Sequence, residues 1–124
     1  MELQLSHECV IDINCSEKFI SLNDWYAGGC WQKRQANKKK YNIIFRNLLK
    51  SYENLKLDKI KVTLDYNLRY DCDNSITIIK LFVDSLKDMG IIDNDCTKIF
   101  QSLEINFNKN LKSGTTNLKV WKLQ

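Results

Sequence analysis

The chain contains no proline, a single histidine (His7) and no apolar run that approaches the ~18–20 residues needed to span a bilayer. Its five cysteines are widely spaced, and no two of them show the C-x₂₋₄-C spacing of a zinc site. These absences argue against a membrane-spanning segment, a structural zinc and a Cys–His nucleophile. An odd number of scattered cysteines is typical of reduced thiols in an intracellular protein.

The remaining composition is that of an ordinary globular protein. Hydrophobic side chains make up 44% of the 124 residues and charged side chains 27%, which suits one core of modest size. We therefore expect a single domain over 1–124. Residues 1–10 have neither a basic start nor a long apolar stretch, so we expect no signal peptide, no membrane partner and a cytoplasmic location.

Hydrophobic periodicity predicts two helices, over 33–52 and 75–89. A single apolar stripe runs along the first, and the second is expected to be capped by Asn74 or Ser75 and to end at Gly90. Strict alternation predicts a half-buried strand over 60–66.

Three further strands are predicted over 9–13, 99–107 and 116–120. The last two are expected to form a hairpin, with Trp121 in the core. The predicted fold class is therefore α+β, a mixed sheet with two main helices in the order β-α-β-α-β-β.

Acidic side chains gather in one part of this basic chain. The net charge is +4, yet the stretch from Asp71 to Asp95 holds six aspartates against two lysines. Asp71 and Asp73 point to the same side if the backbone is extended, and Asp93 and Asp95 join them if the chain doubles back after the second helix. Such carboxylates suit Mg²⁺ or Mn²⁺, which would activate water for phosphodiester hydrolysis, with Lys80 near the phosphate. The alternative is an ordinary solvated acidic surface.

Positive charge is concentrated over 31–50, which contains seven Lys or Arg residues and no acid. Because Trp25, Tyr26 and Trp31 lie beside it in the sequence, the run suits contact with a nucleic-acid backbone. A solvated helix face is the alternative. The residues expected to contact DNA are Lys33, Arg34, Lys38, Lys39, Lys40, Arg69 and Asn23.

Taken in order, these motifs resemble the RusA family of Holliday junction resolvases. The matching stretches are "DCDN" (residues 71–74), Lys80 and "DSLKDMGIIDND" (residues 84–95), with "SLN" (residues 21–23) upstream. The resemblance covers roughly 9–121. It implies a homodimeric, Mg²⁺-dependent endonuclease, in a bacterial or phage-infected cell, that nicks four-way DNA junctions symmetrically and has no small-molecule substrate.

The resemblance also implies roles for individual residues. Asp71, Asp73 and Asp95 correspond to the catalytic, metal-binding carboxylates, and Asp93 lies in the same acidic turn. Lys80 corresponds to the functional lysine.

The sequence departs from the family pattern at three points. Thr77 holds the position where the best-known form of the family has its lysine, although the spacing downstream of Lys80 is retained. Asn94 stands where the family often has Asp, and the usual prolines before the S-x-N element are absent. Two alternatives therefore stay open: a non-cleaving module that binds DNA junctions, with a structural or vacant cation site, and a small interaction protein whose acidic patch meets a basic partner.

Overall fold

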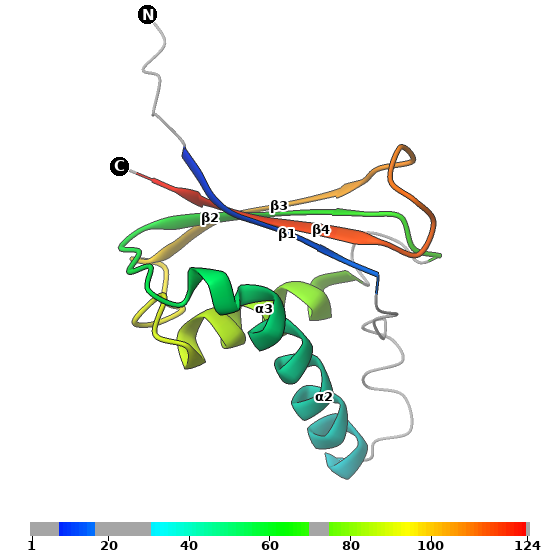
Figure 1. Cartoon of the computed structure of the whole chain (residues 1–124), viewed down its shortest axis with the longest axis horizontal. Coiled ribbons are helices and arrows are strands. Elements are labelled where there is room, and N and C mark those ends of the chain that lie inside the picture. Colours follow the sequence, from blue (N-terminus) through cyan, green and yellow to red (C-terminus); the bar gives the residue numbers. More distant parts are fainter. Residues whose placement is uncertain (1–7, 17–30, 70–74, 124) are drawn as a thin grey trace, which may run out of the picture.

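The computed structural model describes residues 8–16, 31–69 and 75–123, and these form a two-layer arrangement of a sheet and helices (Figure 1). The strands are β1 (Glu8–Cys15), β2 (Ile60–Tyr66), β3 (Phe100–Phe107) and β4 (Thr116–Lys122), and the helices are α2 (Trp31–Leu49), η1 (Lys50–Tyr52) and α3 (Ile76–Asp88). The expected α+β class is confirmed. The described elements differ from the expected order only by the short 3-10 helix η1, which follows α2.

The sheet is mixed, with the strand order β1-β4-β2-β3. Strand β2 pairs in parallel with β3 and antiparallel with β4, and β4 pairs antiparallel with β1. The expected hairpin of the last two strands is wrong, because β3 and β4 lie on opposite sides of β2. The physical reason is that α3 forms the crossover that a parallel β2–β3 pair requires, which leaves the other side of β2 to β4.

The core lies between the sheet and the two helices, which cover one face of the sheet (Figure 1). In β2 the alternation is that of a strand with one buried face: Val62 and Leu64 are fully buried, whereas Lys61 and Thr63 are half-buried on the other face. Between the helices, the rings of Phe45 and Phe82 meet edge to face with centroids 5.5 Å apart. Apolar burial therefore fixes which face of each element points inward.

Helix α2 is attached to the core by its second half. Tyr41, Phe45 and Leu49 are buried at intervals of four residues, whereas the described side chains of 32–40 are exposed or half-buried. In Figure 1 the amino-terminal end of α2 projects away from the sheet. The basic half of this helix is therefore presented to its surroundings. No helix within the described ranges is long and apolar enough to cross a membrane.

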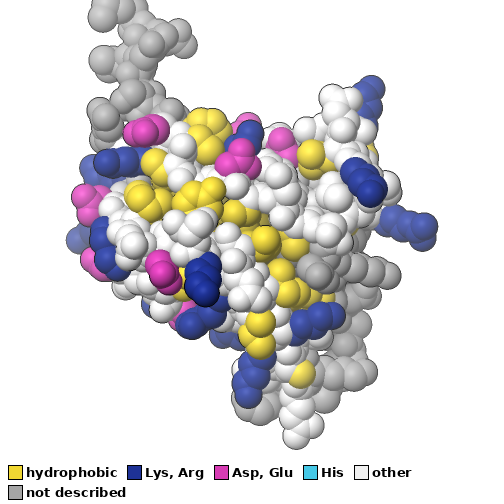
Figure 2. Space-filling model, viewed as in Figure 1, with side chains coloured by type: hydrophobic (Ala, Val, Ile, Leu, Met, Phe, Trp, Pro, Cys, Tyr) yellow, Lys and Arg dark blue, Asp and Glu magenta, His cyan; other side chains and the backbone are white. Residues whose placement is uncertain are grey.

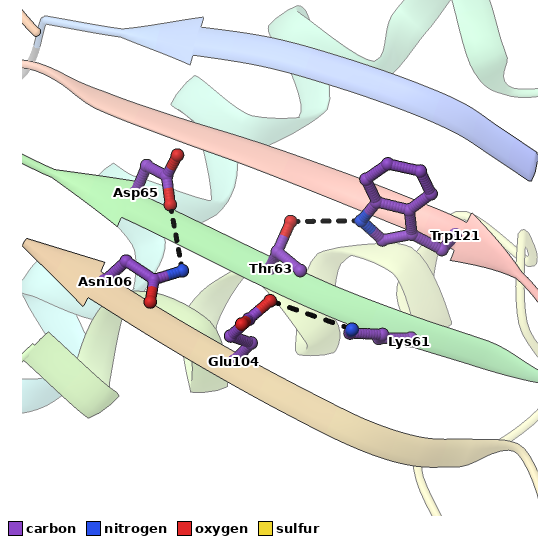
Figure 3. Close-up of polar contacts among 6 residues, drawn as sticks. All are labelled: Lys61, Thr63, Asp65, Glu104, Asn106 and Trp121. Carbon is purple, nitrogen blue, oxygen red and sulfur yellow. Dashed lines mark hydrogen bonds and ion pairs between the residues drawn. The ribbon is translucent and has the colours of Figure 1, made fainter. Parts of the chain in front are cut away.

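The face of the sheet opposite the helices carries polar contacts between neighbouring strands (Figure 3). The Nζ of Lys61 lies 3.7 Å from a carboxylate oxygen of Glu104, and the indole N–H of Trp121 donates to the hydroxyl of Thr63 at 3.1 Å. The expectation that Trp121 belongs to the core is wrong. Because Val120 points inward, its neighbour Trp121 must point outward, and it is half-buried on this outer face.

Candidate active site

A pocket of about 250 Å³ is formed by α3, the segment after it and β3. Three polar side chains line the pocket, namely Lys80, Asp84 and Asp95, and the rest of its lining is apolar: Ile76, Ile79, Val83, Phe100 and Leu103. The five residues from α3 recur at steps of three and one, which places them along one face of the helix. The pocket thus brings together a lysine and two carboxylates against an apolar wall.

The turn after α3 determines where Asp95 lies. Gly90 ends the helix with a φ of +73°, a left-handed conformation that glycine adopts without strain. Ile91 is fully buried, and its carbonyl accepts a hydrogen bond of 2.8 Å from the N–H of Leu57. The carbonyl of Cys96, directly after Asp95, accepts from the N–H of Phe100 at 2.9 Å. Asp95 is therefore held between two anchored points of the backbone.

The carboxyl of Asp84 has a perturbed acidity. Burial raises its pKa above the ordinary value, and the negative charge of Asp95 raises the pKa further, while the positive charges of Lys38 and Lys80 lower it. Asp88 contributes a smaller rise. Like charge from a neighbouring carboxylate disfavours the ionised form of a partly buried carboxyl such as that of Asp84. A cation in the pocket would relieve that repulsion.

Polar contacts connect α2 with α3 beside the pocket. The side-chain amide of Asn42 donates to Asp88 at 3.1 Å and to the hydroxyl of Ser85 at 3.4 Å. Arg46 in turn donates to the amide oxygen of Asn42 at 2.9 Å. Because Lys38 stands four residues before Asn42, it lies on the same side of α2, and its charge acts on Asp84. The basic helix therefore runs close to the acidic side of α3.

The structure distinguishes the two candidate positions for the lysine. Thr77 is buried, with 5% of its surface exposed, whereas Lys80 is exposed and lines the pocket. An ammonium group at position 77 would have to enter the core, where an unpaired charge is strongly disfavoured. Of the two positions, only Lys80 presents a charge to Asp84 and Asp95.

Several expected site residues lie outside the described residues. These are Asp71, Asp73 and Asn23, together with the side chain of Lys33. Asp93 and Asn94 are exposed and do not line the pocket.

The expected DNA contacts that the structure describes differ in exposure. Lys38, Lys39, Lys40 and Arg69 are exposed and Arg34 is half-buried. Figure 2 shows Lys and Arg side chains spread along α2 on the face turned to the viewer.

The described part of the chain contains no group of three or more His, Cys, Asp or Glu side chains that would hold a metal ion. The pocket supplies two carboxylates and neither a thiol nor an imidazole. Carboxylate oxygens are donors that suit Mg²⁺ or Mn²⁺. The residues present fit such an ion in kind, and they need further carboxylates to complete its coordination.

Asp84 is the pocket residue that the sequence pattern did not indicate as a site residue. Its spacing from Lys80 suggested an ordinary surface pair on an exposed helix face. One signal in the sequence could have indicated it. Asp84 stands eight residues after Ile76, a spacing that places both residues on the same side of a helix. The pocket requires β3 as its other wall, and helical periodicity contains no information about that strand.

Comparison with known proteins adds no family assignment. No protein-family model matches the chain, and no curated protein matches it.

Proposed function

We propose that this protein is a Mg²⁺-dependent, structure-specific endonuclease that resolves four-way DNA junctions by paired nicks. The observation that carries the proposal is that Asp95 and Lys80, which belong to different segments, line one pocket together with Ile76. In the sequence Asp73 stands three positions before Ile76. Because three residues of chain span at most about 11 Å, we expect Asp73 within that distance of Ile76.

In this proposal, Asp71, Asp73 and Asp95 would hold the metal ion, and Asp93 would lie at its margin. The ion, when bound, supplies an activated water and offsets charge on the phosphate. Lys80 contributes a fixed positive charge at the same pocket. Among the pocket's charged groups, Asp84 is half-buried beside the apolar wall, which strengthens electrostatic interactions at its carboxyl.

The exposed basic half of α2 would hold the DNA backbone. Lys38 links the two functions because it stands in the basic run and its charge reaches Asp84 in the pocket. Phosphates bound along α2 would therefore lie near the proposed cleavage site. A homodimer is part of the proposal, since two symmetric nicks are most simply made by two copies related by a two-fold axis.

The second candidate is a module that binds DNA junctions without cutting them. It is favoured by the pocket's limited acidity, because the described residues supply two carboxylates and the neighbouring Asn94 is neutral. Such a module would keep the salt-sensitive binding of a basic helix and would yield no product in the presence of Mg²⁺ or Mn²⁺.

The deciding experiment incubates the purified chain with an end-labelled four-way junction and with a matched linear duplex, with and without Mg²⁺. The proposal expects paired symmetric nicks in the junction only, and loss of nicking in Asp73→Asn and Asp95→Asn with junction binding retained. Asp58→Asn, an exposed aspartate that does not line the pocket, is the control for loss of one negative charge. Full cleavage by Asp73→Asn would reject the assignment.

A further inference from the structure

Strand β3 stands at the margin of the sheet and, among the described strands, pairs only with β2 (Figure 3). Its side chains on the helix-covered face are incompletely covered. Phe107 is 54% exposed and Leu103 is 37% exposed, and Ile105 between them is half-buried. An edge strand with unpaired backbone groups and exposed apolar side chains is suited to pairing with another strand.

The opposite edge of the sheet is protected. In β1 the inward side chains Ile11 and Ile13 are 1% and 5% exposed, and the strand is interrupted by an irregularity between Cys9 and Ile11. The hydroxyl of Tyr52 also donates to the backbone carbonyl of Asp12 at 3.3 Å. Among the residues that the structure describes, the two edges therefore differ, and β3 is the one that no further strand covers.

The direction of the backbone groups in β3 follows from one hydrogen bond. The N–H of Asn108 donates to the carbonyl of Tyr66 in β2 at 2.8 Å. Because N–H and C=O groups alternate from side to side along a strand, the neighbouring even-numbered residues also face β2. Leu103, Ile105 and Phe107 consequently direct their N–H and C=O groups toward the free edge.

We propose that two copies of this chain associate through β3, forming an antiparallel pair about a two-fold axis at Ile105. Ile105 then lies opposite its own copy, and Leu103 lies opposite Phe107 of the other chain. All three residues would form hydrogen-bonded pairs. The same pairing covers the exposed apolar side chains of both copies, so the core becomes continuous across one extended sheet.

Side-chain matching selects this register over its two nearest competitors, which are centred on Glu104 and on Asn106. With the axis at Ile105, Glu104 lies opposite the neutral Asn106 of the other copy, and it keeps its ion pair with Lys61 of its own chain. A register centred on Glu104 would instead place two like charges directly opposite each other, which is destabilising. A register centred on Asn106 would place the apolar Leu103 opposite the charged Lys109 of the other copy. The axis at Ile105 avoids both mismatches, and this self-complementarity favours a second copy over an unrelated partner.

The pairing also concerns the candidate active site, because Leu103 belongs to both the free edge and the pocket. A second copy at β3 would border each pocket. Backbone direction, exposure and charge support this pairing independently of any nuclease chemistry. A dimer without cleavage activity would therefore contradict the proposed function and leave the interface intact, whereas a monomer that cuts junctions would contradict the interface alone.

The first test measures the sedimenting mass of the chain without DNA over the micromolar range. The wild type is expected at the mass of two copies, and Phe107→Lys at the mass of one, because a charged side chain would face Leu103 of the partner copy. Ile43→Lys is the matched control, since Ile43 is 61% exposed and belongs to α2 and not to this strand. Thermal unfolding of both variants verifies that each is folded.

The second test examines the register by cross-linking. Cα atoms of a hydrogen-bonded antiparallel pair are about 5.5 Å apart, within disulfide range. Ile105→Cys should therefore form a covalent dimer on mild oxidation, while Ile43→Cys and the parent chain show only background. Cross-linking of Glu104→Cys in place of Ile105→Cys would reject the register. A wild type that is monomeric throughout, or a dimer that Phe107→Lys leaves intact, would reject the interface.

Discussion

Asp84 of α3 and Asp95 of the following segment line one pocket, and the charge of Asp95 raises the pKa of the Asp84 carboxyl. The chain thus brings two acids together on a partly buried surface, with Lys80 and Lys38 as the nearby positive charges. Such an arrangement carries an electrostatic cost in the folded chain. A cation bound beside these carboxylates would change this cost, and the change can be measured as a change in the free energy of unfolding.

Replacing Asp84 with Asn is expected to stabilise the protein at neutral pH. The folded-state pKa of Asp84 is raised above its ordinary value of 3.8, so the folded chain binds more protons than the unfolded chain between the two pKa values. Its free energy of unfolding therefore falls as the pH rises through that window. In Asp84→Asn the side chain at position 84 does not titrate, so this fall in the free energy of unfolding is absent. Urea unfolding should show the variant more stable than wild type at neutral pH, with the difference vanishing below pH 3.8.

Asp58→Asn serves as the control for this measurement, because Asp58 is exposed and does not line the pocket. A difference between wild type and Asp84→Asn that stays constant from acid to neutral pH would contradict the raised pKa. Added Mg²⁺ should reduce the advantage of the variant if the ion binds beside Asp84.

The lysine assignment predicts an asymmetry between positions 80 and 77. Lys80→Ala is expected to lower the rate of junction cleavage by about 100-fold or more, as for loss of one electrostatic stabiliser, with little change in folding because the side chain is exposed. Adding Thr77→Lys to that variant should not restore cleavage. It should instead lower the free energy of unfolding by about 3 kcal/mol or more, because the charge enters the core without a partner.

Single-turnover cleavage and urea unfolding of the two variants test this assignment together. Rescue of Lys80→Ala by Thr77→Lys, without loss of stability, would show that position 77 reaches the reacting phosphate after all. Lys80→Arg is the conservative comparison, since it keeps the charge and alters its geometry.

Gly90→Ala is expected to lower the free energy of unfolding by about 1–2 kcal/mol, because an L side chain at a φ of +73° is strained. The added Cβ would also approach the Nζ of Lys56 to 3.2 Å, and this ammonium donates to the carbonyl of Gly90 at 2.8 Å. Gly114→Ala is the matched control, with a φ of +86° and open space around its Cβ. Urea unfolding should show a loss in both variants, whereas cleavage should fall only in Gly90→Ala, since that turn leads to Asp95.

Local periodicity predicted the elements well because each pattern records which side of an element is buried. The alternation over 60–66 matches β2 at both ends, and the helix predicted over 33–52 corresponds to α2 and η1 together, with a start two residues earlier. Local periodicity could not predict which strands pair with each other in the sheet. The sequence near Phe107 and Thr116 is compatible with a hairpin, and only the crossover through α3 and the position of β2 decide otherwise.

For the candidate site, the sequence predicted individual charged residues but not how they are arranged in space. Its charged residues stand out in the sequence as a group of aspartates and a lysine, so Asp95 and Lys80 were singled out. The participation of Asp84 depends on how α3 and β3 face each other, which no spacing within a helix encodes. The convergence of Asp71 and Asp73 on the same pocket stays a prediction, since both lie outside the described residues.

Neutralising the exposed lysines of α2 is expected to weaken junction binding and its dependence on salt. Each lysine of Lys38, Lys39 and Lys40 that contacts a phosphate should reduce the slope of log K against log salt by about 0.9 when it is replaced by alanine, because fewer counterions are released. The triple variant should therefore lose most affinity at low salt. A control with Lys59, Lys109 and Lys112 replaced by alanine removes equal charge from exposed positions in loops. If fluorescence anisotropy gives both triple variants the same slope, binding reflects overall charge and α2 is not the contact surface.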